Sequence, residues 1–203
     1  MRFFVALEIP KENLPAFQAI QSKLHTLIPQ TKLTSLDKIH LTLAFIGEQP
    51  EELKINLIKI ITNAAREIPA FTVTPAYLDG FPEIHHPLIL WIGVKGDIDK
   101  IHLLRERIKD GLETLHLPVD ERRFVPHISI AKFNKPFPIN NGLEENLQEM
   151  MARQFNPIQI SSIKLFESVP ENPARRLAFG EVDGGQSGGG LHTHNTLAEI
   201  KLF

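Results

Sequence analysis

Two short stretches of the chain repeat one polar pattern. The first begins at His40 and reads His-Leu-Thr-Leu-Ala-Phe, and the second begins at His127 and reads His-Ile-Ser-Ile-Ala-Lys. Apolar and polar residues alternate in both, which predicts half-buried β-strands whose residues i and i+2 share one face. His40 should therefore project with Thr42, and His127 with Ser129. We predict that the two strands face each other across one site, with two imidazoles and two hydroxyls directed into it.

This set of side chains suits displacement at phosphorus. Histidine can take or give a proton near neutral pH, so two histidines in different protonation states can act as base and acid together. Thr42 and Ser129 are poor nucleophiles, because each has its nearest histidine on its own strand and no evident acidic residue orients it. As hydrogen-bond donors to phosphate oxygens they fit well. A small cyclic phosphodiester fits best, since its leaving oxygen stays attached to the sugar.

Other cofactor and metal motifs are weak or missing in the sequence. The chain has no cysteine, which excludes a disulfide framework, a thiolate nucleophile and a cysteine-based metal site. The pairs His85-His86 and His192-x-His194 lack an evident acidic residue that would complete a metal site. No phosphate-binding loop or dinucleotide fingerprint is found. We therefore expect no metal and no cofactor.

The composition describes an ordinary globular chain. It has 203 residues, 42% hydrophobic residues and a net charge of −2, enough for one domain and without the basic excess typical of proteins that coat long nucleic acid. A small basic patch could still recognise one nucleotide or one RNA end, and the candidates for it are Arg122-Arg123, Lys132, Lys135 and Arg175-Arg176. The N-terminus does not resemble a signal peptide, and no apolar run is long enough to cross a bilayer. We expect a cytoplasmic protein.

The elements that must position the two motifs can be predicted from hydrophobic periodicity. Strands are predicted over residues 2–9, 39–46, 71–78, 88–94, 124–133, 158–169, 176–182 and 191–203, and helices over residues 12–27, 50–68, 97–115 and 143–153. Asp97 is the predicted N-cap of the third helix. Short links predict antiparallel pairing of 71–78 with 88–94 and of 158–169 with 176–182. Residues 183–190, rich in glycine, are predicted to form a flexible connection.

The order of these elements predicts an α+β fold. A helix, a histidine strand, a second helix and a strand pair follow one another twice along the chain. We interpret this as an internal duplication, so that residues 1–203 form a single domain of two similar lobes. The alternative is a chance repetition of element order in a mixed fold.

Four segments of the chain resemble one known family. These are residues 2–10 (Arg-Phe-Phe-Val-Ala-Leu-Glu-Ile-Pro), residues 38–47 and 124–132, which hold the two histidine motifs, and the C-terminal residues 196–203. The sequence resembles the 2H phosphoesterase superfamily, defined by two His-x-Thr/Ser-x motifs. Within it, the sequence is similar to the RNA 2′,3′-cyclic phosphodiesterases, formerly called 2′-5′ RNA ligases.

The resemblance implies a bilobal fold with two antiparallel sheets related by a pseudo-two-fold axis, helices outside and a central cleft. It implies metal-free hydrolysis of a 2′,3′-cyclic phosphate, on RNA or on a nucleotide, to a 2′-phosphomonoester. His40 would be the proton donor to the 3′ leaving oxygen, and His127 the base that activates water. Thr42 and Ser129 would bind the phosphate. We expect a monomer without a protein partner.

Two further positions follow from the resemblance. Phe45 occupies the place of an aromatic residue that stacks on the terminal base, and Lys132 the place of an arginine near the phosphate. Both follow their histidine by five residues, and strict strand alternation would turn them to the opposite face. They reach the site only if the strand bends or ends there. His194 occupies the place of a tyrosine near the start of the last strand.

Two other functions remain open from the sequence. One is RNA ligation through a 2′-5′ bond, which is the reverse reaction and would use the same residues. The other is a non-catalytic module that binds a nucleotide or an RNA end.

Overall fold

The computed structural model describes residues 1–119, 123–151, 155–170 and 192–203. The strands are β1 (Arg2–Glu8), β2 (Lys32–Leu33), β3 (His40–Glu48), β4 (Phe71–Phe81), β5 (Ile89–Gly96), β6 (His127–Lys132), β7 (Ile158–Ile160), β8 (Ser162–Pro170) and β9 (His192–Lys201). The α-helices are α1 (Leu14–Leu27), α2 (Lys54–Ala65), α3 (Ile98–Thr114) and α4 (Asn141–Met151). Three short 3₁₀ turns cover Lys11–Asn13, Leu36–Lys38 and Glu51–Leu53.

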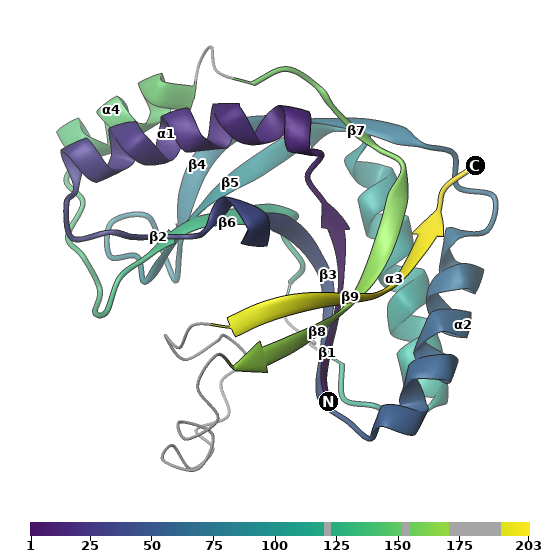
Figure 1. Cartoon of the computed structure of the whole chain (residues 1–203). Helices are drawn as coiled ribbons and strands as arrows, with labels where there is room; N and C mark the ends of the chain where they lie inside the picture. The colour runs from purple at the N-terminus through teal and green to yellow at the C-terminus, as the bar shows by residue number, and fades with distance from the viewer. Residues whose placement is uncertain (120–122, 152–154, 171–191) are drawn as a thin grey trace.

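The strands of the described residues form one nine-stranded sheet with the order β7-β4-β5-β6-β3-β1-β8-β9, and β2 adds to β6 (Figure 1). The α+β class is confirmed. The two predicted sheets are two halves of one sheet, joined where Leu41 of β3 pairs antiparallel with Ile128 of β6. They join because the two histidine strands would otherwise be edges with unpaired backbone groups.

The helices pack in two pairs against one face of the sheet (Figure 1). The first pair, α1 and α4, contacts β6 and β4, and the second pair, α2 and α3, contacts β8, β9 and β3. Strand β1 shows the division between the faces, because Phe3, Val5 and Leu7 belong to the main core while Phe4 and Ala6 form a small separate cluster with Phe166. The side chains of the two histidine motifs therefore lie on the face of the sheet that the helices leave uncovered.

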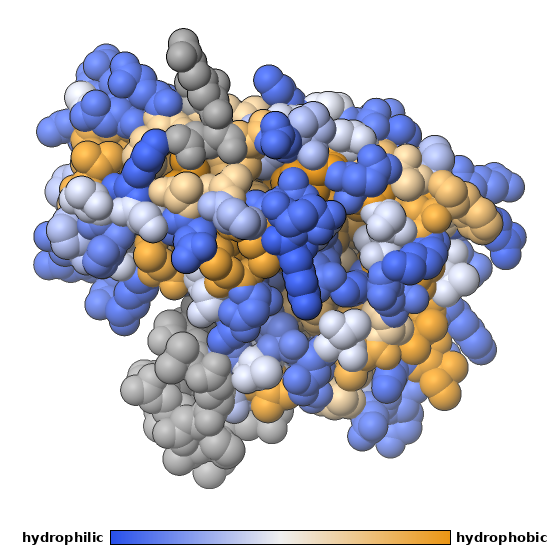
Figure 2. Space-filling view, turned by 45° about the horizontal axis from the view of Figure 1, so that its top comes forward, coloured by the Kyte–Doolittle hydropathy of each residue, from blue (hydrophilic) through white to orange (hydrophobic). Residues whose placement is uncertain are grey.

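The outer surfaces of the helices are mainly polar. Figure 2 shows hydrophilic residues over most of one face of the molecule, with smaller hydrophobic patches between them. This agrees with the amphipathic stripe predicted for the first helix, of which Phe17, Ile20 and Leu24 are buried. No helix within the described ranges is long and apolar enough to cross a membrane.

The element order repeats in the structure as predicted, with β1-α1-β3-α2 followed later by β5-α3-β6-α4. Helix α1 lies between β1 and β3 in the chain but contacts β6, and helix α3 lies between β5 and β6 but contacts β3. Each half of the sheet is thus covered in part by a helix from the other repeat. The duplication itself stays a prediction.

Some predicted details differ from the structure. Strands β4 and β5 pair antiparallel as predicted. The strand predicted over 158–169 is divided at Ser161, and its second part, β8, pairs with β1 and β9. Residues 176–182 and 183–190, like Arg122 and Arg175-Arg176, lie outside the described residues.

Asp97 is the N-cap residue of α3, as predicted, but its side chain does not cap the helix. Its carboxylate makes no side-chain capping hydrogen bond to the helix. The Oδ2 atom instead accepts a hydrogen bond of 3.0 Å from the backbone N–H of Thr72 and lies 3.2 Å from Nζ of Lys100. The predicted position of the N-cap is therefore confirmed, while its carboxylate binds the adjacent strand, which offers an N–H group that the sequence alone does not reveal.

The contact between α2 and α3 depends on Gly111. A Cβ atom at this position would lie 2.5 Å from Cγ2 of Ile60. We expect Gly111→Ala to lower the free energy of unfolding by about 1 kcal/mol, because overpacking outweighs the gain of alanine in a helix. Gly142→Ala in α4 is the matched control, since the nearest atom to its Cβ would be 3.7 Å away. Denaturant unfolding checks this, and equal shifts in the two variants would contradict it.

Candidate active site

Strands β3 and β6 bring the two histidine motifs together. Leu41 and Ile128 pair with each other and are buried, so their neighbours His40, Thr42, His127 and Ser129 project from the opposite face. These four side chains are partly buried. An antiparallel register about this pair places Thr42 on the side of His127, and His40 on the side of Ser129. Each hydroxyl therefore has the histidine of the other strand nearby as well as its own.

A β-bulge at the same place in each histidine strand changes the alternation. Against β1, Thr42 pairs with Ala6 and Ala44 with Val5, which leaves Leu43 as the extra residue. Against β5, Ser129 pairs with Trp91 and Ala131 with Leu90, which leaves Ile130 as the extra residue. Both extra residues follow their histidine by three positions. One extra residue moves every later side chain to the other face of the strand.

The bulges turn Phe45 and Lys132 to the face of the sheet that carries the histidines. Phe45 pairs with Phe4 in the sheet, and the ring centroid of Phe4 lies 6.1 Å from Phe45 and 5.1 Å from His40. Phe45 is 48% exposed, which leaves its ring open to a ligand. The charge of Lys132 lies close enough to His40 to lower the pKa of that imidazole. Its effect is smaller than those of burial, His194 and His127. Phe45 and Lys132 were expected to reach the site only if the strand bends or ends there, and the bulges provide this change of direction.

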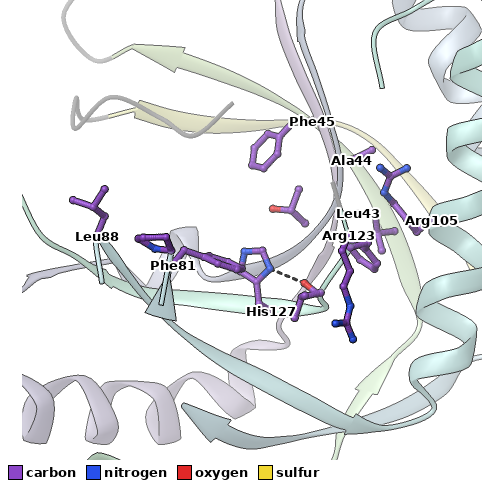
Figure 3. A pocket seen from close by; sticks show the side chains of 12 residues that line it. Leu43, Ala44, Phe45, Phe81, Leu88, Arg105, Arg123 and His127 are labelled. Atoms are coloured by element: carbon purple, nitrogen blue, oxygen red, sulfur yellow. Dashed lines mark hydrogen bonds between the residues drawn. The ribbon is translucent and has the colours of Figure 1, made fainter. Parts of the chain in front are cut away.

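The two imidazoles are held by the same hydrogen bond. Nδ1 of His40 lies 2.8 Å from the carbonyl oxygen of Lys38. Nδ1 of His127 lies 2.8 Å from the carbonyl oxygen of Val125, and the dashed line from His127 in Figure 3 marks this second hydrogen bond. A carbonyl oxygen only accepts, so Nδ1 must donate in both rings. In the neutral ring the other nitrogen, Nε2, is then the proton acceptor. Each ring therefore has Nε2 left for chemistry.

Aromatic rings flank both imidazoles. His40 lies beside Phe4 and Phe166, with centroid distances of 5.1 and 6.3 Å. His127 is in edge contact with Phe81 and Trp91, with centroid distances of 4.9 and 5.6 Å. None of these four rings was predicted from the sequence to belong to the site. Phe4, Trp91 and Phe166 lie within predicted strands, whereas Phe81 lies in the segment predicted as a loop between 71–78 and 88–94.

Burial keeps both imidazoles neutral before an anion binds. The pKa of His40 is lowered to about 3, mainly by burial and also by the neighbouring His194, His127 and Lys132, while the hydrogen bond to the Lys38 carbonyl opposes the shift. Burial also lowers the pKa of His127, against the Val125 carbonyl. The pKa of Lys132 is lowered by burial as well. A negatively charged ligand would reverse this effect, because an opposite charge nearby favours the charged form.

A cavity of about 420 Å³ opens beside His127. Figure 3 shows Phe45 on one wall and Phe81 and His127 on the other, and Thr42 also lines the cavity. His40, Ser129 and Lys132 are not part of its lining. The cavity is of a size for a nucleotide fragment, with an aromatic ring on each of two walls.

Two arginines lie at the far end of this cavity. Arg105 of α3 is only 5% exposed, with its guanidinium 5.7 Å from the ring centroid of Phe124, and Arg123 is exposed. Arg105 was not predicted from the sequence to belong to the site. The signal for it was an arginine within the apolar stripe of the third helix, beside Leu104 and Ile108.

The described residues contain no group of three or more histidine, cysteine, aspartate or glutamate side chains that could hold a metal ion. Of the other histidine pairs, His85 and His86 each lie near a single glutamate, at 3.8 and 3.2 Å. His192 lies 3.1 Å from the hydroxyl of Ser168. His194, in contrast, reaches the site, and its ring centroid lies 5.4 Å from that of His40.

Comparison with known proteins agrees with this geometry. A family model described as the 2′-5′ RNA ligase superfamily matches residues 33–168. Among curated proteins, the RNA 2′,3′-cyclic phosphodiesterase of Methanocaldococcus jannaschii is 28% identical over 85% of this chain and 95% of its own. The protein of the same name from Thermotoga maritima is 26% identical over 88% of this chain and 94% of its own.

Solved structures share the fold. TT0787 of Thermus thermophilus superposes with a TM-score of 0.74 at 21% identity, over 100% of this chain and 98% of its own. The LigT protein of E. coli, in a structure described as its complex with NADP+, superposes with a TM-score of 0.66 at 18% identity, over 99% of this chain and 97% of its own. Another LigT structure, with a TM-score of 0.62 at 19% identity, is described as its complex with 3′-AMP and is matched over 99% of this chain and 97% of its own.

Proposed function

The chain belongs to the 2′-5′ RNA ligase superfamily, and from this we infer that it is an RNA 2′,3′-cyclic phosphodiesterase. It hydrolyses the 2′,3′-cyclic phosphate of an RNA end or of a nucleotide to a 2′-phosphomonoester. The observation that supports this most is the pair of imidazoles on adjacent strands, each with Nδ1 held by a backbone carbonyl and Nε2 left for proton transfer.

In the proposed mechanism the two histidines have different roles. His127 takes a proton from water through Nε2 as the water oxygen attacks phosphorus. The bond from phosphorus to the 3′ oxygen breaks, and His40 gives the proton on its Nε2 to that oxygen. One proton enters the protein and one leaves it, so the two histidines end with their protonation states exchanged. Each transfer contributes about 10²–10⁴ in rate.

The protonated form of His40 depends on the substrate. In the protein alone its pKa is lowered to about 3, mainly by burial. The cyclic phosphate carries a negative charge, and its binding next to the ring raises this pKa. Substrate binding therefore supplies the condition under which His40 can act as the acid.

The other predicted residues bind the substrate in this proposal. Thr42 and Ser129 donate hydrogen bonds to the non-bridging oxygens, and Lys132 adds a positive charge near them. Phe45 stacks on the terminal base. No metal or cofactor takes part in the proposed steps. A cytoplasmic location, a monomeric state and a single domain of two similar lobes, all expected from the sequence, also belong to the proposal.

The test is hydrolysis of a nucleoside 2′,3′-cyclic phosphate by purified protein in the presence of EDTA. We expect turnover, with phosphorus NMR showing the 2′-phosphomonoester. A complete lack of turnover would refute the enzyme and leave the binding module, and a 3′-phosphate product would refute the assigned roles of the two histidines. An RNA with a 5′-hydroxyl end, added to the same assay, measures the reverse ligation.

Phe45→Ala is expected to weaken substrate binding. Stacking of a base on an aromatic ring is worth about 1–3 kcal/mol, so we expect KM to rise about 5- to 150-fold while kcat changes much less. Phe203→Ala is the matched control, because Phe203 is an exposed phenylalanine at the C-terminus. Steady-state kinetics with a cyclic mononucleotide check this prediction. If KM in Phe45→Ala equals that of the control, Phe45 does not stack on the base.

A further inference from the structure

His194 is a third imidazole beside the two motif histidines. It lies on β9, which is separated from β3 by β8 and β1 in the sheet. In a flat sheet three strand spacings amount to about 14 Å. The ring centroid of His194 nevertheless lies only 5.4 Å from that of His40 and 4.9 Å from that of Phe4. The curl of the sheet therefore brings the beginning of β9 over the face that carries the motifs (Figure 1).

Ring contacts hold His194 in this place. The edge of one ring meets the face of the other in both pairs, at interplanar angles of 69° with His40 and 68° with Phe4. Its side chain is partly buried. Among the described residues no hydrogen bond to its ring nitrogens is found. The imidazole thus contributes polar atoms to the site without an assigned partner in the fold.

The charged groups that face His194 are mostly basic. They come from four elements, and they are His40 on β3, Lys132 on β6, Lys38 and Asp37 on the turn before β3, and His192 on β9 itself. The pKa of His194 is lowered to about 4, mainly by burial and also by Lys38, His192 and Lys132, while Asp37 opposes the shift. All of these groups except Asp37 are basic. Such a concentration of basic groups favours an anion as the ligand of the His194 imidazole.

We propose that His194 is a further phosphate-binding residue, which contacts the phosphate together with His40 and takes up a proton when that anion binds. The ligand class is a tetrahedral oxyanion with two negative charges, such as the 2′-phosphomonoester product. This inference rests on the proposed function for the identity of the ligand, but the anion site itself can be tested without turnover.

The proton uptake follows from electrostatics. Before binding, the imidazoles of His40 and His194 are both neutral, since a charge on either would be buried among other basic groups. A dianion beside the two rings favours their charged forms, and each protonated ring then donates a charge-assisted hydrogen bond to an oxygen. Because protons bind together with the anion, affinity for the anion should rise as the pH falls.

The probe is inorganic sulfate, which carries two negative charges and does not titrate near neutral pH. Calorimetry at pH 6.5 in two buffers of different ionisation enthalpy gives both Kd and the number of protons taken up. His194→Phe keeps a ring against His40 but loses the proposed hydrogen bond to the anion. We expect its Kd for sulfate to rise about 10- to 100-fold, the effect of losing one hydrogen bond to a charged group, and its proton uptake to fall by one. For His194→Lys, which carries a permanent charge, we expect Kd near that of wild type with the same loss of one proton.

His25→Phe is the control, because His25 is an exposed histidine on α1 and is not among the groups that face His194. It should leave the proton uptake on sulfate binding unchanged and Kd within about three-fold of wild type. The inference is overturned if His194→Phe takes up as many protons as wild type, if His194→Lys binds sulfate as weakly as His194→Phe, or if wild type does not bind sulfate. Circular dichroism and thermal unfolding of each variant show whether it is folded.

The same variants separate this inference from the proposed function. If wild type hydrolyses cyclic phosphate and His194→Phe takes up as many protons as wild type, only the phosphate contact of His194 is refuted. If wild type does not hydrolyse cyclic phosphate but His194→Phe takes up one proton fewer on sulfate binding, the proposed reaction is refuted. The anion site with three histidines is then still supported.

Discussion

His127→Ala and His40→Ala are each expected to lower kcat for a nucleoside 2′,3′-cyclic phosphate by about 10²–10⁴-fold. Each substitution removes one of the two groups proposed to move a proton. The double variant should lose less than the product of the two single losses, because residues that act in one step are not additive. His25→Ala is the control, since His25 is exposed on α1, and it should keep the rate of wild type. Steady-state kinetics at saturating substrate give these values.

A change of leaving group tests which histidine is the acid. In a cyclic phosphorothiolate with sulfur at the 3′ position, the leaving group departs as a thiolate and needs no proton. For this substrate we expect His40→Ala to lose less than about ten-fold, while His127→Ala keeps its full loss. The opposite pattern would exchange the roles of the two histidines. A rate for His40→Ala within a few-fold of wild type on the oxygen substrate would refute the mechanism with two histidines.

Thr42→Val and Ser129→Ala are expected to have the next largest effect. Each removes one hydrogen-bond donor proposed for the phosphate oxygens while it keeps the shape of the strand. Loss of one such donor lowers kcat by about 10²–10³-fold. Both residues lie on the face of the histidines, so the variants should keep the free energy of unfolding close to that of wild type.

The matched controls for this prediction exchange the two hydroxyl residues. Thr42→Ser and Ser129→Thr keep a donor at each place, and we expect their kcat to stay within about five-fold of wild type. Comparison of Thr42→Val with Thr42→Ser then isolates the hydroxyl from the methyl group. If Thr42→Ser loses as much as Thr42→Val, the hydroxyl is not the feature that matters and packing at the strand accounts for the loss.

The neutral state of the histidines has a consequence for the interpretation of these experiments. Burial lowers the pKa of both His40 and His127. The acid and the base are therefore not distinguished by the protein before substrate binds. The phosphate makes the difference, because it raises the pKa of the imidazole nearest to its charge. For this reason the roles are tested with the leaving group and not with the pKa values of the protein alone.

The sequence by itself determined the elements and the two motifs. Alternation of apolar and polar residues with a period of two identified the histidine strands, and spacings of three and four identified the amphipathic helices. These are local patterns, since they depend on which face of one element is buried. The pairing of β4 with β5 was also predictable, because a short connection leaves two adjacent strands few alternatives to antiparallel pairing.

Only the tertiary structure decided how the side chains meet. The bulges at Leu43 and Ile130, which turn Phe45 and Lys132 to the face of the sheet that carries the histidines, arise from pairing with β1 and β5. His194 reaches His40 from the far edge of one half of the sheet. These features depend on contacts between strands distant in sequence and on the curl of the sheet, neither of which leaves a periodic signal in a single strand. The residue types of the site could thus be predicted, but their arrangement is a property of the whole sheet.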